Sequence, residues 1–397
     1  MSDDLEARCA ALGIAPRYVD IEGRTHEVPA AALRALLEEL EDARPVPAGS
    51  PPADGACWRA LAPGQRVWGP AVQLYALRSA RNWGIGDFAD LASLVDWAAG
   101  RGAALVGVNP LHALFAHEPM HCSPYSPSTR LFWNTLYLAV DRVPDFVECE
   151  AARARVGAAE FRAQLARLRE SPLVDYPGVA AAKSEVLHLL YAHFRDRHLA
   201  QDTPRARAFA AFRRERGDDL AQHAAWEARS AGSADAGYYE YLQWLADAQI
   251  EEAAGRARAL GMPIGLYLDV AVSVDRGGSE VAANAALFAR GASLGAPPDD
   301  FNPRGQDWGL PPPRPDRMRA SGYALFRRTL AANMRHAGAI RIDHVMQLQR
   351  LYWVPAGFPA TEGAYVRYPL DELVAVLAEE SRRHRCMVIG EDLGTVA

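Results

Sequence analysis

Short apolar runs alternate with helical patterns along most of this chain, and this alternation is the feature that most limits its possible folds. Five runs are expected to form strands: 67–77, 104–114, 263–272, 339–345 and 387–393. Helical patterns over 239–260, 323–337 and 370–384 precede the last three, and an amphipathic segment capped by Asp87 follows the first. This alternation predicts βα units and a parallel sheet. Because each strand ends in polar residues, we expect a (β/α) barrel with its site at the carboxyl ends of the strands.

The rest of the sequence divides around these strands. We expect an N-terminal extension over 1–65, with a helix from Pro29 to Asp42 and a Pro-rich linker from Arg44 to Gly55. Residues 66–146 then form the first part of the barrel, 147–261 an Ala/Arg/Glu-rich helical insertion, and 262–397 the second part, with strands three to five. The predicted fold is therefore a TIM-type (β/α)8 barrel that is incomplete, with about five of eight strands and none of strands six to eight.

Charge and cysteine usage exclude several classes of partner. Lys and Arg number 43 against 49 Asp and Glu, a net charge of −6, and no basic run stands out, so nucleic acid and anionic membranes are poor partners. The five cysteines are scattered without a CxxC pair, which indicates reduced thiols and no structural zinc. We see neither a secretory signal nor an apolar stretch long enough for a membrane span. We expect a soluble, cytoplasmic protein that needs no metal or other cofactor.

Two carboxylates follow neighbouring predicted strands. In AIRID, Arg341 and Asp343 share one face because strand residues alternate, and the arginine is expected to lower the pKa of the aspartate and keep it ionised, as a glycosidic nucleophile requires. Glu391 leaves the next strand after an apolar run, where desolvation would raise its pKa and retain a proton. Adjacent strands lie about 4.8 Å apart, and retaining enzymes need carboxyls about 5–5.5 Å apart. A purely structural ion pair remains the alternative for Arg341 and Asp343.

Several longer motifs make the pattern specific. IRIDHV (340–345) followed by VIGEDLG (388–394) resembles the nucleophile and acid/base motifs of the amylomaltase, or disproportionating enzyme, family of 4-α-glucanotransferases in the α-amylase-like clan. Four further segments resemble that family's glucan-binding loops and occur in the same order: NWGIGDF (82–88), NPLHALF (109–115), SPYSPSTR (123–130) and GAPPDDFNPRGQDWGLPP (295–312). The resemblance covers about residues 66 to 397.

The resemblance implies roles for individual residues. It makes Asp343 the nucleophile, Glu391 the general acid/base, and Arg341 the residue that orients the nucleophile and contacts the sugar. The positions that match donor and acceptor subsites are Tyr75, Ser79, Asp299, Gln306, Trp308 and His344. Tyr125 is a further aromatic candidate for stacking on a sugar. For Trp308 a buried core position is the alternative, although the flanking glycines and proline favour a binding loop.

The implied reaction is transfer of an α-1,4-glucan segment to glucose or another maltooligosaccharide by double displacement. The family's third carboxylate follows the acid/base motif beside a histidine and has no counterpart here, so we expect a C-terminally truncated chain. A catalytically impaired glucan-binding fragment and an α-glucan hydrolase remain alternative functions. Donor length, cyclic products and oligomeric state stay open.

Overall fold

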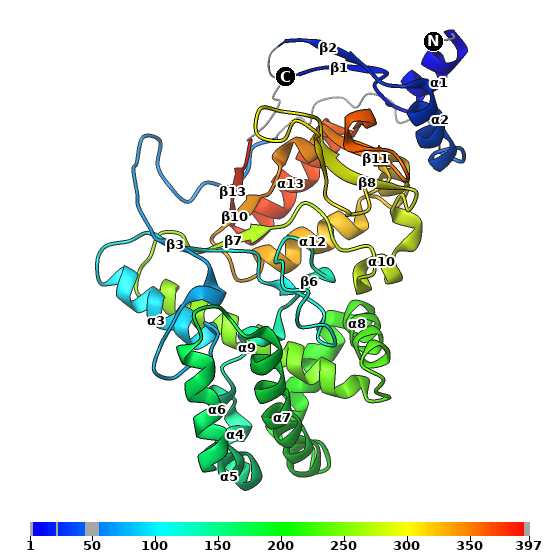
Figure 1. Cartoon of the computed structure of the whole chain (residues 1–397). Coiled ribbons are helices and arrows are strands. Elements are labelled where there is room, and N and C mark those ends of the chain that lie inside the picture. Colours follow the sequence, from blue (N-terminus) through cyan, green and yellow to red (C-terminus); the bar gives the residue numbers. More distant parts are fainter. Residues whose placement is uncertain (1–2, 21–22, 44–54, 393–397) are drawn as a thin grey trace.

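A five-stranded parallel sheet lies at the centre of the computed structural model, which describes residues 3–20, 23–43 and 55–392 (Figure 1). Its strands are β3 (Ala71–Val72), β4 (Leu105–Val108), β7 (Gly265–Val270), β10 (Ala339–Ile342) and β13 (Met387–Gly390). They lie side by side in chain order, and every pairing is parallel. All five predicted strands are thus confirmed, although each is shorter than its apolar run. Among the described residues the sheet is open, with β3 and β13 as its outer strands, as expected for an incomplete barrel.

Helices pack beside these strands in the manner of a βα barrel. They are α3 (Phe88–Ala99), α9 (Ala236–Ala259), α12 (Ala324–Met334) and α13 (Leu370–His384). The bounds of α13 coincide with the predicted helix, because its buried residues Leu373, Val376, Leu377 and Glu380 recur at helical spacing. Asp87 is the N-cap of α3, as predicted: its side chain accepts the backbone N–H of Ala89 and of Asp90.

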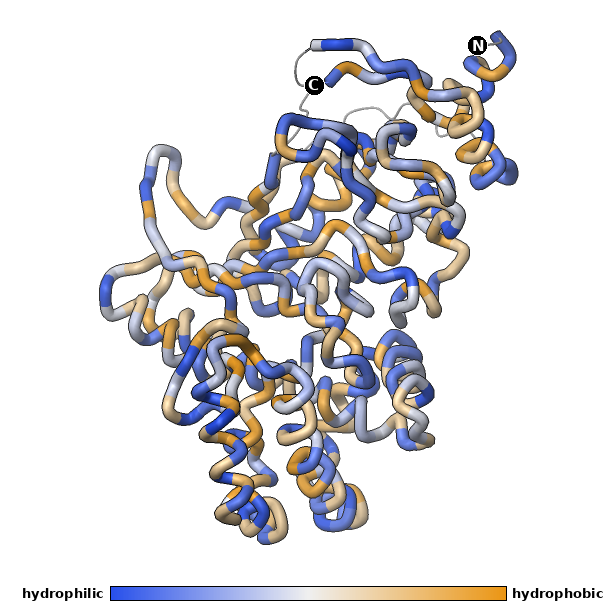
Figure 2. Tube along the Cα trace, in the orientation of Figure 1, coloured by the Kyte–Doolittle hydropathy of each residue, from blue (hydrophilic) through white to orange (hydrophobic). Residues whose placement is uncertain are grey.

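The segment between β6 and β7 is helical. It contains α4 (Pro144–Glu148), α5 (Glu150–Gly157), α6 (Ala159–Glu170), α7 (Tyr176–Phe194), the π-helical turn η4 (Arg195–Leu199), α8 (Pro204–Ser230) and α9. These helices lie together on one side of the sheet, at the bottom of Figure 1. Hydrophilic and hydrophobic residues alternate along them in Figure 2, as in amphipathic helices. That 147–261 is an insertion packed beside the barrel stays a prediction; its last helix, α9, packs directly on α3 and β7.

A four-stranded antiparallel sheet was not anticipated from the sequence. It contains, in spatial order, β12 (Ala364–Arg367), β11 (Arg350–Pro355), β8 (Ala292–Ala296) and β9 (Gln306–Asp307). A short hairpin of β5 (His112–Ala113) and β6 (Thr129–Trp133) was also missed. The sheet buries Tyr352 and Trp353 almost completely, and it places Gln306 at its edge.

The N-terminal residues pack against this second sheet. They form α1 (Asp3–Ala11), β1 (Arg17–Val19), β2 (Thr25–Glu27) and α2 (Ala30–Glu39). The backbone N–H of Ala15 donates to Tyr365 O at 2.8 Å, and the ring of Tyr18 meets those of Tyr352 and Tyr365 edge-on. The predicted linker, apart from Gly55, lies outside the described residues. None of the helices in the described ranges has the length and apolar character that a membrane crossing requires.

Candidate active site

One arginine side chain gathers three carboxylates at the carboxyl ends of three adjacent strands. Arg341 lies in β10, level with Asp269 of β7. Its Nη1 donates to Asp269 Oδ1 at 2.7 Å and lies 2.9 Å from Asp343 Oδ1. Its Nη2 lies 3.7 Å from Glu391 Oε2. The two carboxylates predicted from the sequence therefore meet at a single guanidinium, and each is at least four-fifths buried.

The turn after β10 is fastened to the end of β13. The backbone N–H of His344 donates to Glu391 Oε2 at 2.9 Å, and that of Val345 donates to Glu391 O at 2.8 Å. His344 has φ of 50°, a left-handed conformation that costs a non-glycine residue about 1 kcal/mol or more. These bonds hold the strained turn, and they also fix the position of the Glu391 carboxylate relative to Asp343.

Burial and charge oppose each other at this cluster. Burial raises the pKa of Asp343, Arg341 lowers it and Glu391 raises it, and burial dominates. The expectation that Arg341 would leave Asp343 with a lowered pKa was therefore wrong in its net direction, because the desolvation of a largely buried carboxyl outweighs one ion pair. Burial disfavours the charge of Arg341, but its bonds to Asp269 and Asp343 raise its pKa overall, so the guanidinium stays ionised.

His344 and the loop around β9 form the next layer of the site. Burial lowers the pKa of His344 against the opposing effect of Glu391 and Asp343, so its imidazole is neutral at pH 7. The Trp308 ring meets the His344 ring edge-on at 5.4 Å, and its Nε1 donates to Gln306 Oε1 at 3.1 Å. Trp308 is half-buried and packs against the hydrophobic core. The binding role of Trp308 stays a prediction.

Asp269 is the member of the cluster that the sequence analysis missed. Besides Arg341 it accepts the hydroxyl of Tyr125 at 2.9 Å, which ties that predicted aromatic residue to the site. Both line a cavity of about 210 Å³ on the inner face of the sheet, together with Asn109 and Tyr267. The signal was present, because LYLDV, like AIRID, is a strand-like run with an aspartate close to its carboxyl end.

Three predicted subsite residues make their contacts elsewhere. Ser79 Oγ donates to Asp90 Oδ1 at 2.7 Å, within the network that caps α3. Asp299 accepts the backbone N–H groups of Phe301 and Asn302 and so closes its own turn. Tyr75 is half-buried in the 3-10 turn η1 (Leu74–Ala76). Their subsite roles remain predictions.

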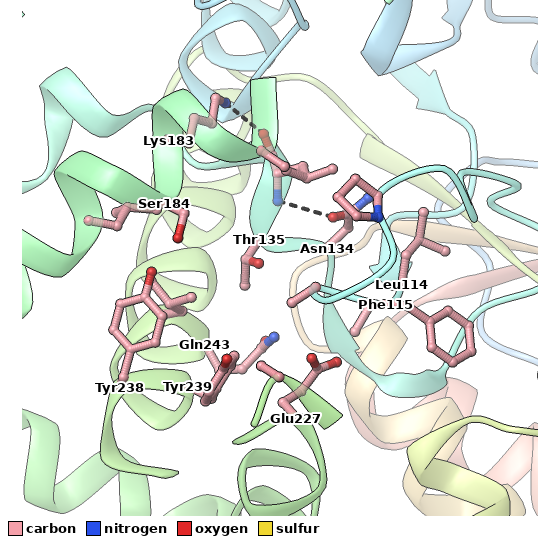
Figure 3. A pocket seen from close by; sticks show the side chains of 18 of the residues that line it. Leu114, Phe115, Asn134, Thr135, Lys183, Ser184, Glu227, Tyr238, Tyr239 and Gln243 are labelled. Atoms are coloured by element: carbon pink, nitrogen blue, oxygen red, sulfur yellow. Dashed lines mark hydrogen bonds between the residues drawn. The ribbon is translucent and has the colours of Figure 1, made fainter. Parts of the chain in front are cut away.

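A second cavity, of about 290 Å³, lies between helices α7, α8 and α9 and the turn that follows β6 (Figure 3). Glu227 projects toward it from α8, close to Tyr239 and Gln243. Burial raises the pKa of Glu227 to about 8, with a backbone hydrogen bond from Ala116 opposing. Its Oε2 is buried and has no hydrogen-bond partner among the described residues. We conclude that Glu227 holds its proton at neutral pH.

This carboxyl predicts a pH-dependent stability. Because the folded-state pKa is above the unfolded value, the contribution of Glu227 is fully present below about pH 4.5 and is lost as the pH rises toward 8. Glu227→Gln keeps a neutral group, so we expect it to match the unaltered protein at pH 5 and to be more stable at pH 9 by about 1–3 kcal/mol. Urea unfolding at both pH values measures this difference. Glu118→Gln, at an exposed position, is the control. If both variants changed the free energy of unfolding equally at pH 9, Glu227 would not be the carboxyl with the raised pKa.

The fold and the site together define a class: a (β/α)-barrel protein with paired carboxylates and an arginine at adjacent strand ends, the arrangement of retaining enzymes that act on glycosides. A family model described as 4-alpha-glucanotransferase, that of glycoside hydrolase family 77, matches residues 72–236 and 227–397. The chain belongs to this family.

Individual relatives agree with this assignment. The 4-alpha-glucanotransferase of Haemophilus influenzae is 40% identical over 368 residues, which cover 84% of this chain and 53% of the relative. The 4-alpha-glucanotransferase of Mycobacterium tuberculosis is 39% identical over 371 residues, which cover 84% of this chain and 50% of the relative. The chain thus spans about half the length of these curated relatives.

Solved structures agree on the fold. Amylomaltase from Corynebacterium glutamicum superposes with a TM-score of 0.83 at 28% identity, over 99% of this chain and 72% of that one. Amylomaltase from Streptococcus agalactiae, in complex with acarbose, superposes with a TM-score of 0.63 at 21% identity. The match covers 84% of this chain and 70% of that one, and it shows a likeness of fold alone.

Proposed function

We propose that this protein is a 4-α-glucanotransferase, which transfers a segment of an α-1,4-glucan to the 4-hydroxyl of glucose or of another maltooligosaccharide. The observation that carries the proposal is the convergence of Asp343 and Glu391 on the Arg341 guanidinium. Membership of glycoside hydrolase family 77 supports it.

The proposed reaction has two displacements at one anomeric carbon. Asp343 attacks C1 and forms a covalent ester, while Glu391 gives its proton to the departing glycosidic oxygen. Glu391, now ionised, removes the proton of an incoming 4-hydroxyl, whose oxygen displaces Asp343 and restores the α-linkage. Arg341 orients Asp343 and stabilises its charge, and no step needs a metal or an organic cofactor.

The surrounding residues are proposed to bind sugar. Sugars have apolar faces and a rim of hydroxyls, which suit aromatic rings beside fixed hydrogen-bonding groups. Trp308 and Tyr125 supply the rings, and Gln306 and the neutral His344 supply polar groups. Such contacts favour transfer over hydrolysis if they hold the acceptor sugar where water would otherwise attack.

Product analysis on maltotriose tests the function. A transferase yields glucose together with maltodextrins longer than the starting trisaccharide. Glucose and maltose without longer chains would support the α-glucan hydrolase instead. Maltotriose binding by calorimetry without any product would support a glucan-binding protein, and either result would overturn the proposal.

Removing the arginine charge is expected to change the pH dependence of the reaction. Arg341 lowers the pKa of Asp343, so Arg341→Gln should raise that pKa further and move the acidic limb of the kcat/KM profile to higher pH. We also expect kcat to fall about 100-fold, because Asp343 loses its orienting bonds. Arg256→Gln, which breaks an exposed ion pair with Asp96, is the control. An unshifted limb would contradict this role for Arg341.

A further inference from the structure

Three side chains that could hold a metal ion converge within the helical segment, away from the strand ends. Glu148 ends α4, His193 lies in the last turn of α7, and His198 lies in the π-helical turn η4. One ligand atom from each of these three lies within 4.8 Å of the others. Asp145, at the start of α4, lies beside them. The proposed function uses none of these residues.

The distances between these atoms fit a tetrahedral metal site. Glu148 Oε2 lies 3.2 Å from His198 Nε2 and 3.6 Å from His193 Nε2, and Asp145 Oδ1 lies 3.5 Å from His198 Nε2. Zinc binds histidine nitrogen and carboxylate oxygen at about 2.0–2.2 Å, so neighbouring ligand atoms in a tetrahedron lie about 3.3–3.6 Å apart. The two distances from the Glu148 oxygen to the histidine nitrogens are therefore close to the spacing that an ion would require, and the two nitrogens lie within 4.8 Å of each other.

The π-helical turn explains how two histidines five residues apart face the same ion. In an α-helix such residues point about 140° away from each other. In η4 the N–H of Ala200 donates to Arg195 O at 3.0 Å, the five-residue hydrogen bond that widens a helical turn. Both Nε2 atoms consequently approach the same Glu148 oxygen. π-Helical turns of this kind are frequent at functional sites.

Two polar atoms of the cluster lack a hydrogen-bond partner within the described parts of the chain. Asp145 is fully buried, and its Oδ2 accepts from Tyr241 and Arg205, but its Oδ1 has no hydrogen bond. His193 Nε2 is buried and has none either. Leaving such a group unsatisfied costs about 1–3 kcal/mol, a cost that a bound cation would remove for His193.

The remaining contacts suit metal coordination and access. His198 Nδ1 lies 2.9 Å from Thr203 Oγ1, a second bond of the type that orients a histidine ligand and fixes its tautomer. Glu148 is about half exposed, so an ion can enter from solvent and be closed in by this side chain.

We propose that Glu148, His193 and His198 form a binding site for a divalent transition-metal ion, with zinc as the best match. With three protein ligands, a water molecule would complete the tetrahedron. The ion links α4 to the junction of α7 and α8 and thereby stabilises the helical segment. The proposal does not rest on the proposed transferase activity.

Metal binding to the whole protein after treatment with EDTA tests the site. We expect one zinc per chain by calorimetry, and an increase in Tm of several degrees at saturating zinc. His198→Ala should weaken zinc binding at least about 100-fold, and Thr203→Val about 10-fold. His188→Ala removes a histidine from the same helix that hydrogen-bonds Ser184 and stacks on Tyr238, and it should leave zinc affinity unchanged.

Cobalt gives a readout that does not depend on any variant folding. The unaltered protein with one equivalent of cobalt should show the intense visible absorption of tetrahedral coordination, and zinc should displace it. Weak six-coordinate bands, or zinc binding that His198→Ala and His188→Ala weaken equally, would overturn the proposal. So would the absence of zinc binding by the unaltered protein.

Discussion

Asp343→Asn is expected to lower kcat for maltotriose disproportionation by about 10⁴-fold or more, the scale seen when an enzyme loses its nucleophile. Asparagine keeps the shape of the side chain and can still lie beside Arg341 and Glu391. It cannot form the glycosyl ester, because its amide oxygen is a far weaker nucleophile than a carboxylate. Steady-state release of glucose measures the change, and calorimetry with maltotriose should show that binding survives.

A matched variant separates chemistry from general damage. Asp96→Asn makes the same replacement on the surface of α3, where the carboxylate pairs with Arg256. Exposed pairs contribute about 0–1 kcal/mol, so we expect kcat and Tm to change little. If Asp343→Asn kept more than about a tenth of the activity, Asp343 could not be the nucleophile.

The candidate site was predictable from the sequence to the extent that strand alternation determines it. Arg341 and Asp343 share a face because they are two residues apart, and consecutive strands of a βα barrel are neighbours in space. The structure therefore brings Glu391 to Arg341 from a position fifty residues further along the chain. The pairing of β10 with β13, with Arg341 level with Ile389, is the arrangement that the pattern implied.

The balance of charges was less predictable, since it depends on burial and on partners from other segments. Nothing local to AIRID reveals that Asp269 also binds Arg341, or that desolvation raises the pKa of Asp343 overall. The second sheet was missed because β9 has only two residues and lies within 295–312, the segment that was interpreted as a binding loop. Short antiparallel strands of this kind form through tertiary contacts and carry little periodicity of their own.

The metal cluster shows a different limit of sequence reasoning. The sequence analysis expected no metal site because no close ligand spacing was recognised. Glu148 and His193 are 45 residues apart, and the five-residue step from His193 to His198 places two ligands together only when the helix adopts a π turn. A regular α-helix would separate them, so the cluster becomes visible only in three dimensions.

Glu391→Gln is expected to lower kcat on maltotriose by about 10²–10⁴-fold, because glutamine can neither protonate the leaving oxygen nor deprotonate the acceptor. The loss should depend on the substrate. A maltosyl fluoride has a leaving group that departs without a proton, so the variant should still form the glycosyl ester on Asp343 and should then transfer it slowly. The ester should therefore accumulate, and mass spectrometry of the intact protein should detect the added maltosyl group.

A small anion such as azide tests the role of Glu391 in the second displacement. Azide attacks without giving up a proton, so it should release the accumulated ester from Glu391→Gln as a glycosyl azide, while Asp343→Asn should gain nothing from it. Glu185→Gln, which removes a carboxylate from an exposed ion pair with Arg155, should behave as the unaltered protein on both substrates. An equal loss of rate on maltotriose and on maltosyl fluoride would mean that Glu391 positions the turn at His344 through its hydrogen bond and transfers no proton.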